Sequence, residues 1–180
     1  HAPNPARRHD SVPCGRQCLQ RRIEDETGVP EEIMLAIYGH ETNYGAVTGN
    51  FNAPEALASL AYEGRRRVLF EGELIAALKM IDKGVPQYAI TGSWAGALGK
   101  PQFLPSVYLR LARDGDGDGY ADIWRSEVDA MTSIANYFVN AGWRRGEDWG
   151  FAVNVPETFN RGNIRTRMSS PRCPRVYARH

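Results

Sequence analysis

The sequence has few cysteines, no excess of charge of either sign and no long hydrophobic run. Twenty-two Lys and Arg residues against 21 Asp and Glu residues leave a formal net charge of +1. This balance removes any whole-chain electrostatic argument for a nucleic-acid-binding or a strongly basic membrane-binding protein. No apolar stretch approaches the roughly 20 residues that span a bilayer, so we expect no transmembrane segment. The chain begins with His1, and we expect a signal or anchor segment to have been removed before it.

The three cysteines lie near the two ends of the chain, at positions Cys14, Cys18 and Cys173. In an oxidising compartment they predict one disulfide and one free thiol, and either Cys14 or Cys18 could be bonded to Cys173. The sequence does not choose between these pairs. Three thiolates without a nearby histidine argue against a zinc site.

The chain has 180 residues, of which 42% are hydrophobic, and this suffices for one domain with a sizeable core. Residues 1–17 carry prolines and charges without apolar periodicity, which predicts an N-terminal arm. Residues 156–180 are rich in arginine, which predicts a C-terminal tail. The predicted domain spans residues 18–155.

Apolar residues within the predicted domain recur mostly at helical spacing. Ile33, Ile37 and Glu41 share one stripe of a helix that starts near Pro30. Only Phe151–Val155 alternates as a strand does. We therefore predict an α+β, helix-dominated domain with at most a small sheet. Further helices are expected from Asn52 to Leu60, from Leu69 to Ile81, from Pro105, and from Ser126 to Phe138.

Glu41 is the charged residue that the helical pattern explains least well. It follows Ile37 on the predicted buried stripe, at a helix end marked by the breakers Asn43 and Gly45. Burial and the negative end of the helix dipole both disfavour an ionised carboxylate there. A carboxyl that stays protonated near neutral pH is suited to general acid catalysis. From the pattern alone, a glutamate at a frayed helix end that points into water is an equal alternative.

The segment Gly92–Phe103 is rich in small residues and holds Trp94 as well. Small residues let a ligand approach the backbone closely, aromatic rings offer flat faces to sugars, and Ser93 and Gln102 offer hydrogen bonds. These features predict a sugar-binding wall. The residues alone favour the alternative of a tight structural loop between two helices.

The segment Asp114–Asp122 matches the first half of an EF-hand calcium loop. Its second half departs from that pattern, because Arg125 stands where a bidentate glutamate belongs. Either Glu127 or Asp129 would have to close the metal site. Asp129 has a competing role, because Ser126 and Asp129 also form a capping-box pattern at a helix start.

Four motifs occur in one order along the chain: Ile37–Gly45, Gly92–Ser106, Asp114–Gly119 and Ser133–Tyr137. Together they resemble the lytic murein transglycosylases of the membrane-bound transglycosylase B type, over about residues 20–155. The resemblance implies a lysozyme-like fold. It also implies cleavage of the β-1,4 bond between N-acetylmuramic acid and N-acetylglucosamine in peptidoglycan, with a 1,6-anhydro end as product.

The resemblance assigns a role to each matching residue. Glu41 is expected to be the single acid/base carboxylate, and no cofactor is required for the chemistry. The expected substrate-binding residues are Ser93, Gln102, Tyr137, Tyr44 and Asn136. A structural calcium ion is expected at Asp114, Asp116, Asp118, Tyr120 and Asp129, with Asp129 as the closing carboxylate.

The resemblance also implies a setting for the protein. We expect a monomer in the bacterial periplasm or cell envelope, with peptidoglycan glycan strands as its partner and no nucleic acid. Members of the family continue well beyond the length seen here, with further cleft residues that have no counterpart in residues 156–180. The chain is therefore expected to be either a short member with a reduced cleft or a fragment.

Other functions stay open at this point. A hydrolytic muramidase would pair Glu41 with a second carboxylate, either Glu55, Glu63, Glu71 or Asp122, that activates water. A non-catalytic peptidoglycan-binding module and a calcium sensor are further alternatives. Transglycosylation depends on one carboxyl held uncharged beside the sugar, so an exposed Glu41 or a second carboxylate facing it would argue against the mechanism.

Overall fold

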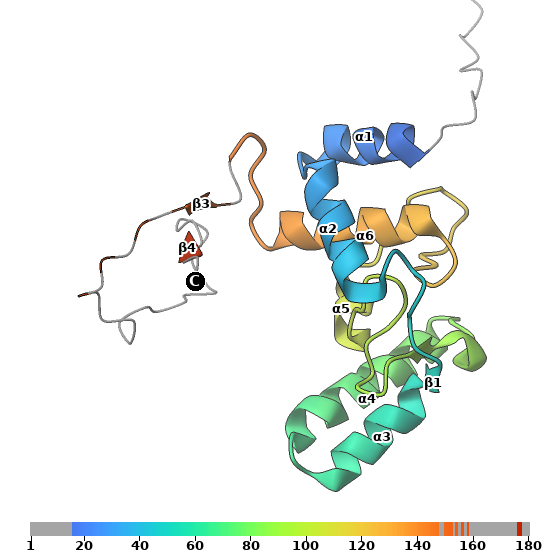
Figure 1. Ribbon diagram of the computed structural model, residues 1–180. Coiled ribbons are helices and arrows are strands. Elements are labelled where there is room, and N and C mark those ends of the chain that lie inside the picture. Colours follow the sequence, from blue (N-terminus) through green and yellow to red (C-terminus); the bar gives the residue numbers. More distant parts are fainter. Residues whose placement is uncertain are drawn as a thin grey trace, which may run out of the picture.

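The structure, a computed structural model, describes residues 16–147, 150–152, 154, 156, 158 and 176–177 (Figure 1). This described part contains six α-helices, one 3₁₀ helix and four short strands. The predicted helix-dominated α+β class is therefore confirmed. Most of the expected arm and tail lies outside the described residues, and the domain boundaries stay a prediction.

One group of helices surrounds a first hydrophobic core. It consists of α1 (Arg16–Thr27), α2 (Glu31–Thr42) and α6 (Glu127–Asn140), which lie together in the upper half of Figure 1. The sequence analysis did not identify α1. The buried residues of this core are Ile23, Val29, Met34, Tyr38, Met131, Ile134 and Ala135.

The remaining helices surround a second core. They are α3 (Ala53–Glu63), α4 (Arg67–Asp82) and α5 (Pro105–Leu111), in the lower half of Figure 1. The start of α3 is as predicted, because the side chain of Asn52 caps it by accepting a 3.2 Å hydrogen bond from the backbone N–H of Glu55. The buried residues of this core are Ala53, Met80, Ile90, Leu98, Phe103, Leu111 and Ile123.

Two small strand pairs complete the described part. Strand β1 (Phe51–Asn52) pairs antiparallel with β2 (Thr91–Gly92), and this pair joins the start of α3 to the start of the glycine-rich segment. The 3₁₀ helix η1 (Gln87–Ala89) precedes β2. Strand β3 (Phe151–Ala152) lies within the predicted strand 151–155 and pairs in parallel with β4 (Val176–Tyr177).

The buried face of α2 differs from the predicted one. Met34, Tyr38 and Thr42 are its buried residues, so the buried stripe lies one position beyond the stripe predicted through Ile37 and Glu41. Apolar residues run almost continuously through the middle of this helix, and either stripe satisfies the helical period. Contacts with α1 and α6 decide which one is buried.

The buried face of α4 shows the same kind of difference. Its buried residues include Ala76, Ala77 and Met80, whereas Ile75 and Leu78 are exposed. Small alanine side chains let α4 pack closely against α3, which contributes its own buried alanines. Close helix packing therefore takes precedence over burial of the larger aliphatic residues.

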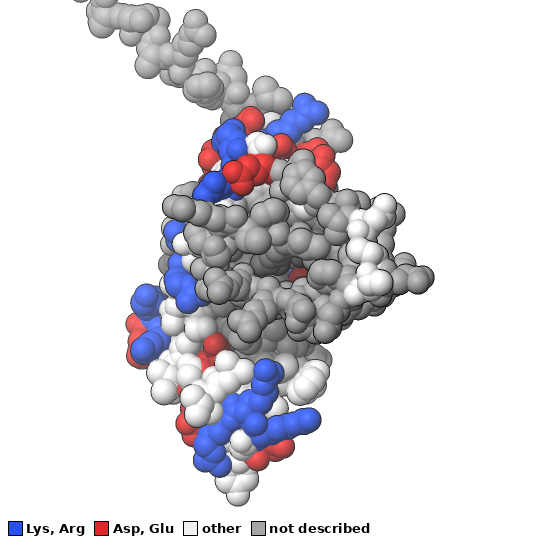
Figure 2. Space-filling model, turned by 90° about the vertical axis from the view of Figure 1, so that its left-hand side faces the viewer, with Lys and Arg blue, Asp and Glu red and all other residues white. Residues whose placement is uncertain are grey.

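The surface carries both signs of charge. Figure 2 shows Lys and Arg side chains mixed with Asp and Glu side chains over the described parts of one face, in keeping with the near-neutral sequence. Within the described residues, no helix has the length and apolar character needed to cross a membrane. Cys18 is disulfide-bonded; Cys14 and Cys173, its two candidate partners, lie outside the described residues, so the choice of pair stays open.

Candidate active site

Glu41 lies in the last turn of α2. The helix ends at the predicted breaker, because Asn43 adopts a left-handed conformation (φ 49°) and donates a 2.9 Å backbone hydrogen bond to Gly39. The Glu41 side chain is exposed, and within the described residues its carboxylate makes no hydrogen bond or ion pair. The predicted burial of Glu41 is therefore wrong, because Thr42 takes the buried position on this face of the helix.

Thr42 anchors the end of α2 to the glycine-rich segment. Its hydroxyl donates a 2.9 Å hydrogen bond to the carbonyl of Lys100 and accepts one of 3.1 Å from the N–H of Gly45. A Cβ on Gly45, whose φ is +83°, would lie 2.6 Å from the hydroxyl of Tyr38, so only glycine fits there. The turn that carries Glu41 is therefore anchored by the hydrogen bonds of the next residue, Thr42, which is buried.

The glycine-rich segment is a tightly bonded double turn. Leu98 pairs with both Gly92 and Phe103 in short β-bridges, and the hydroxyl of Ser93 accepts a 3.1 Å hydrogen bond from the N–H of Ala97. Gln102 has φ +52°. The residues alone favoured a structural loop, and these bonds agree with that interpretation.

Gln102 also faces the loop that follows α2. Its side-chain amide donates to the carbonyls of Thr48 at 3.1 Å and Gly99 at 3.0 Å. Neither bond uses Oε1, which remains an acceptor for a ligand. All three non-glycine residues with positive φ in the described part lie in these two loops, namely Asn43, Tyr44 and Gln102.

Exposed aromatic rings lie in the same two loops and on α6. Trp94 is 65% exposed, Tyr44 is 59% exposed and Tyr137 is 42% exposed. The ring of Tyr137 packs 5.8 Å from that of Phe103, beside Gln102. The structure therefore exposes flat apolar faces in the loop after α2, in the glycine-rich segment and on α6.

The side chain of Asn136, a predicted substrate-binding residue, makes hydrogen bonds within the protein. Its amide donates a 2.8 Å hydrogen bond to the carbonyl of Leu111, and its Oδ1 accepts one of 3.1 Å from Asn140. These bonds join α6 to α5. The geometry thus gives Asn136 a role in joining the two helices, and its contact with substrate stays a prediction.

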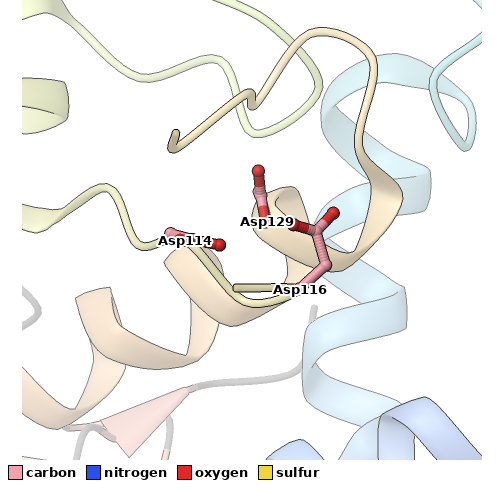
Figure 3. Close-up of side chains that lie close together, drawn as sticks. All are labelled: Asp114, Asp116 and Asp129. Atoms are coloured by element: carbon pink, nitrogen blue, oxygen red, sulfur yellow. The ribbon is translucent and has the colours of Figure 1, made fainter. Parts of the chain in front are cut away.

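The Asp-rich loop brings three carboxylates together. Oxygen atoms of Asp114, Asp116 and Asp129 lie within 4.8 Å of one another. Figure 3 shows Asp129 at the start of α6 and the other two on the preceding loop. Asp118 is not in this group, and its side chain accepts a hydrogen bond from the N–H of Tyr120 at 2.8 Å.

Asp129 acts as the closing residue of the loop. It is fully buried, and its two oxygens accept backbone hydrogen bonds from Gly115 at 2.8 Å and from Asp122 at 2.7 Å. The hydroxyl of Ser126 caps α6 by accepting from the N–H of Asp129, but the N–H of Ser126 bonds to the carbonyl of Asp122 instead of the Asp129 side chain. Only half of the predicted capping box forms, which leaves the Asp129 carboxylate directed at the loop.

The donor set fits a hard divalent cation. Calcium takes carboxylate and carbonyl oxygens, and the three clustered carboxylates supply such atoms. Burial raises the pKa of Asp129, and repulsion from Asp116 and Asp114 adds to the rise, while hydrogen bonds from Gly115 and Asp122 oppose it. The backbone N–H of Gly119 is the main cause of the lowered pKa of Asp114. A cation between these groups would relieve their repulsion.

Tyr108 lies close to this loop. Its hydroxyl donates a 3.0 Å hydrogen bond to the carbonyl of Ala121, and its ring lies 5.4 Å from that of Trp124. Burial raises its pKa to about 12, and the negative charges of Asp122 and Asp129 act in the same direction.

The carboxylates considered as a second catalytic group are engaged elsewhere or lie at other helix ends. Glu63 accepts a hydrogen bond from the N–H of Arg65, and Glu71 lies 3.8 Å from Arg67, both beside the turn between α3 and α4. Asp122 accepts from the N–H groups of Trp124 and Arg125. Glu55 lies in the first turn of α3.

Some residues that join distant parts of the site carry no signal in the sequence. Glu73 is buried on α4, and its carboxylate accepts from the N–H of Ser106 at 2.9 Å and from its hydroxyl at 2.7 Å, which fixes the start of α5. No local pattern could have found this pair, because the two residues are 33 positions apart. Thr42 and Lys100 were missed for the same reason.

The fold and the site define a small helical domain with one exposed glutamate beside a glycine-rich loop. The chain belongs to the transglycosylase SLT domain family, whose model matches residues 15–175. It is 42% identical over 129 residues to the membrane-bound lytic murein transglycosylase B of Escherichia coli (strain K12), and this match covers 71% of the chain and 36% of that protein.

Solved structures agree with this assignment. SltB3 from Pseudomonas aeruginosa, in complex with NAG-anhNAM-pentapeptide, superposes with a TM-score of 0.72 at 44% identity, over 78% of this chain and 38% of that chain. The Escherichia coli lytic transglycosylase Slt35, in complex with calcium, gives a TM-score of 0.69 at 40% identity, over 73% of this chain and 43% of that chain. The lysozyme-like fold is confirmed, and the chain spans less than half the length of each relative.

Proposed function

We propose that this chain is the catalytic domain of a lytic murein transglycosylase. It cleaves the β-1,4 bond between N-acetylmuramic acid and N-acetylglucosamine and leaves a 1,6-anhydro end. The observation that carries this proposal is the position of Glu41 at the end of α2, beside Thr42, whose hydroxyl bonds to Lys100 of the glycine-rich segment. Family membership and the relative solved with an anhydro-sugar ligand support it.

The proposed reaction needs one carboxyl group. Glu41 donates a proton to the glycosidic oxygen as the bond to the muramoyl C1 breaks, and the muramoyl N-acetyl oxygen stabilises the developing charge at C1. The sugar's own 6-hydroxyl then attacks C1 while Glu41 takes the hydroxyl proton. The carboxyl is restored, no water is consumed, and no cofactor enters either step.

The exposure of Glu41 argues against a carboxyl that the free protein itself holds uncharged, so the proposal requires that the bound substrate supplies the dry environment. In the free protein the carboxylate faces water. A glycan laid over Tyr44, Gln102 and Tyr137 would cover it and exclude water, which strengthens the interactions at the reacting centre and suppresses hydrolysis.

The residues around Glu41 are assigned roles in binding the glycan. Ser93 and Gln102 orient the substrate, with Oε1 of Gln102 accepting a hydrogen bond from a sugar N–H or O–H group. Tyr44 and Tyr137 contact the apolar faces of the rings. Asn136 supports the cleft indirectly by joining α6 to α5.

The Asp-rich loop is proposed to hold a structural calcium ion. Asp114, Asp116 and Asp129 supply carboxylate oxygens, and Asp118 and the carbonyl of Tyr120 complete the expected set. The ion would neutralise the clustered negative charge and stabilise the loop before α6. It takes no part in the chemistry at Glu41.

The substrate implies the setting. Peptidoglycan glycan strands lie in the bacterial cell envelope, so we place the protein there, acting as a monomer. The relative from Escherichia coli is described as membrane-bound.

Digestion of purified sacculi tests the reaction class. The proposal expects muropeptides with 1,6-anhydro ends, detected by mass spectrometry, and their loss in Glu41→Gln. Glu32→Gln is the matched control, because Glu32 is exposed on the same helix but at its other end. Reducing ends would indicate a hydrolytic muramidase, and binding without cleavage would indicate a non-catalytic module.

A further inference from the structure

Lys100 lies where the glycine-rich segment meets two other parts of the chain. Its backbone N–H donates a 2.9 Å hydrogen bond to the carbonyl of Ile123. Its ammonium group donates to the carbonyls of Trp124 at 2.7 Å and Arg125 at 2.8 Å. The lysine therefore makes three hydrogen bonds to one short segment just before α6.

On its other side Lys100 contacts the end of α2. Its carbonyl accepts the 2.9 Å hydrogen bond from the hydroxyl of Thr42. Its Cε lies 3.1 Å from the place that a Cβ on Gly45 would occupy, so the aliphatic part of the side chain passes closely over the turn after Glu41. One residue thus connects the catalytic turn to the segment before α6.

The segment that Lys100 binds is itself well fixed. The side chain of Asp122 accepts from the N–H groups of Trp124 at 3.1 Å and Arg125 at 2.9 Å, while the ammonium of Lys100 binds the carbonyls of the same two residues. The indole N–H of Trp124 also donates to Thr91 at 2.7 Å. Because this segment is fixed, its hydrogen bonds to Lys100 can restrain the position of the turn after α2.

The surroundings of the ammonium agree with a partly desolvated position. Burial lowers the pKa of Lys100, and the negative charges of Asp122 and Glu127 oppose this change. A lysine on the open surface would gain little from such contacts.

We propose that Lys100 is a positioning residue for the transglycosylase reaction. Its ammonium group binds the segment before α6, while its backbone carbonyl and aliphatic stem contact the end of α2. Lys100 thereby fixes the last turn of α2 and sets where the Glu41 carboxyl lies relative to the glycosidic oxygen. The inference rests on the proposed role of Glu41. A displacement of about 1 Å at a catalytic group can reduce the rate by about a hundredfold, so loss of the clamp acts on turnover more than on substrate binding.

Lys100→Met tests the clamp, because it keeps the aliphatic stem and removes the ammonium. With a soluble glycan of defined length we expect kcat to fall about tenfold, with KM changed less than about twofold. Lys100→Arg retains donors for the two carbonyls and is expected to keep most of the wild-type kcat. Lys79→Met is the matched control, because Lys79 is exposed on α4.

Hydrogen exchange provides a readout that does not need activity. In Lys100→Met the amides of residues 43–47 should exchange faster than in the wild type, while those of α3 stay unchanged. A wild-type kcat in Lys100→Met, an equal loss in Lys100→Arg, or unchanged exchange at residues 43–47 would each overturn the proposal. If the wild type itself releases no anhydro ends, the proposed function fails and the clamp on Glu41 fails with it, whereas faster exchange would still show that the ammonium holds the turn.

Discussion

Glu41 and Asp129 both lie at helix ends, but they differ in burial and in hydrogen bonding. Glu41 is exposed at the end of α2 and has no hydrogen-bond partner among the described residues. Asp129 is fully buried at the start of α6, and each of its oxygens accepts a backbone hydrogen bond. The first is available for reaction, whereas the second is committed to holding a loop.

The two carboxylates are therefore suited to different tasks: one to proton transfer and the other to stabilising the fold. A carboxylate without protein partners can exchange a proton with a substrate and contributes little to folding. A buried carboxylate whose removal would leave two backbone N–H groups unsatisfied stabilises the fold instead. Substitutions at the two positions should therefore affect different measurements.

The largest expected effect is on catalysis at Glu41. Glu41→Gln removes the proton donor and should lower the rate of glycan cleavage by about 100- to 10,000-fold, as measured by release of anhydro-muropeptides. The thermal midpoint should stay at the wild-type value, because the side chain has no partner to lose within the described part of the chain. A variant that cleaves at the wild-type rate would remove Glu41 from the mechanism.

The opposite pattern is expected at Asp129. Asp129→Ala leaves the N–H groups of Gly115 and Asp122 without acceptors and should reduce the free energy of unfolding by about 2–4 kcal/mol, as measured by urea denaturation. It should also abolish a calcium-dependent rise in the thermal midpoint.

Asp116→Ala offers a comparison, since Asp116 is exposed. In this variant the calcium-dependent rise in the thermal midpoint should be smaller, while the stability without calcium stays near that of the wild type. Full calcium response in Asp129→Ala would contradict the proposed ion site.

A smaller effect is expected from Tyr108 at high pH. Its pKa is raised from 10.0 to about 12 in the folded protein, so the folded state holds the proton more tightly than the unfolded state. This stabilisation is complete below pH 10 and is lost as the pH rises towards 12. The stability advantage of the wild type over Tyr108→Phe should therefore shrink by about 1–2 kcal/mol across that window, as followed by urea unfolding. An advantage that stays constant with pH would show that the phenol titrates normally.

The smallest effect is expected at Trp94, whose ring is exposed on the glycine-rich segment. Trp94→Ala should raise KM by about two- to tenfold through loss of stacking against a sugar ring, with little change in kcat or thermal midpoint. Val68→Ala, on the exposed face of α4, is a control for loss of surface apolar area. Unchanged KM would remove Trp94 from the sugar-binding wall.

The local features of this fold could be predicted from the sequence because they depend on residues close together in the chain. The Asn52 cap, the break at Asn43 and the Asp-rich turn each formed where the pattern placed them. The buried side of α2 could not be predicted, because two adjacent stripes fit the helical period and the packing of distant helices chooses between them. Glu73 and Lys100 find their partners far along the chain, which no local pattern encodes.

The left-handed backbone at Tyr44 and Gln102 places a limit on how stable this domain can be. Each non-glycine residue in that conformation stores about 1–3 kcal/mol, and glycine at either position would release part of it. Glycine would also delete the phenol ring of Tyr44 or the amide of Gln102, both of which are proposed to contact the glycan. Heat resistance and the proposed binding of glycan therefore make opposite demands at these two positions, and a thermostable variant is expected to keep both residues and to gain its stability elsewhere.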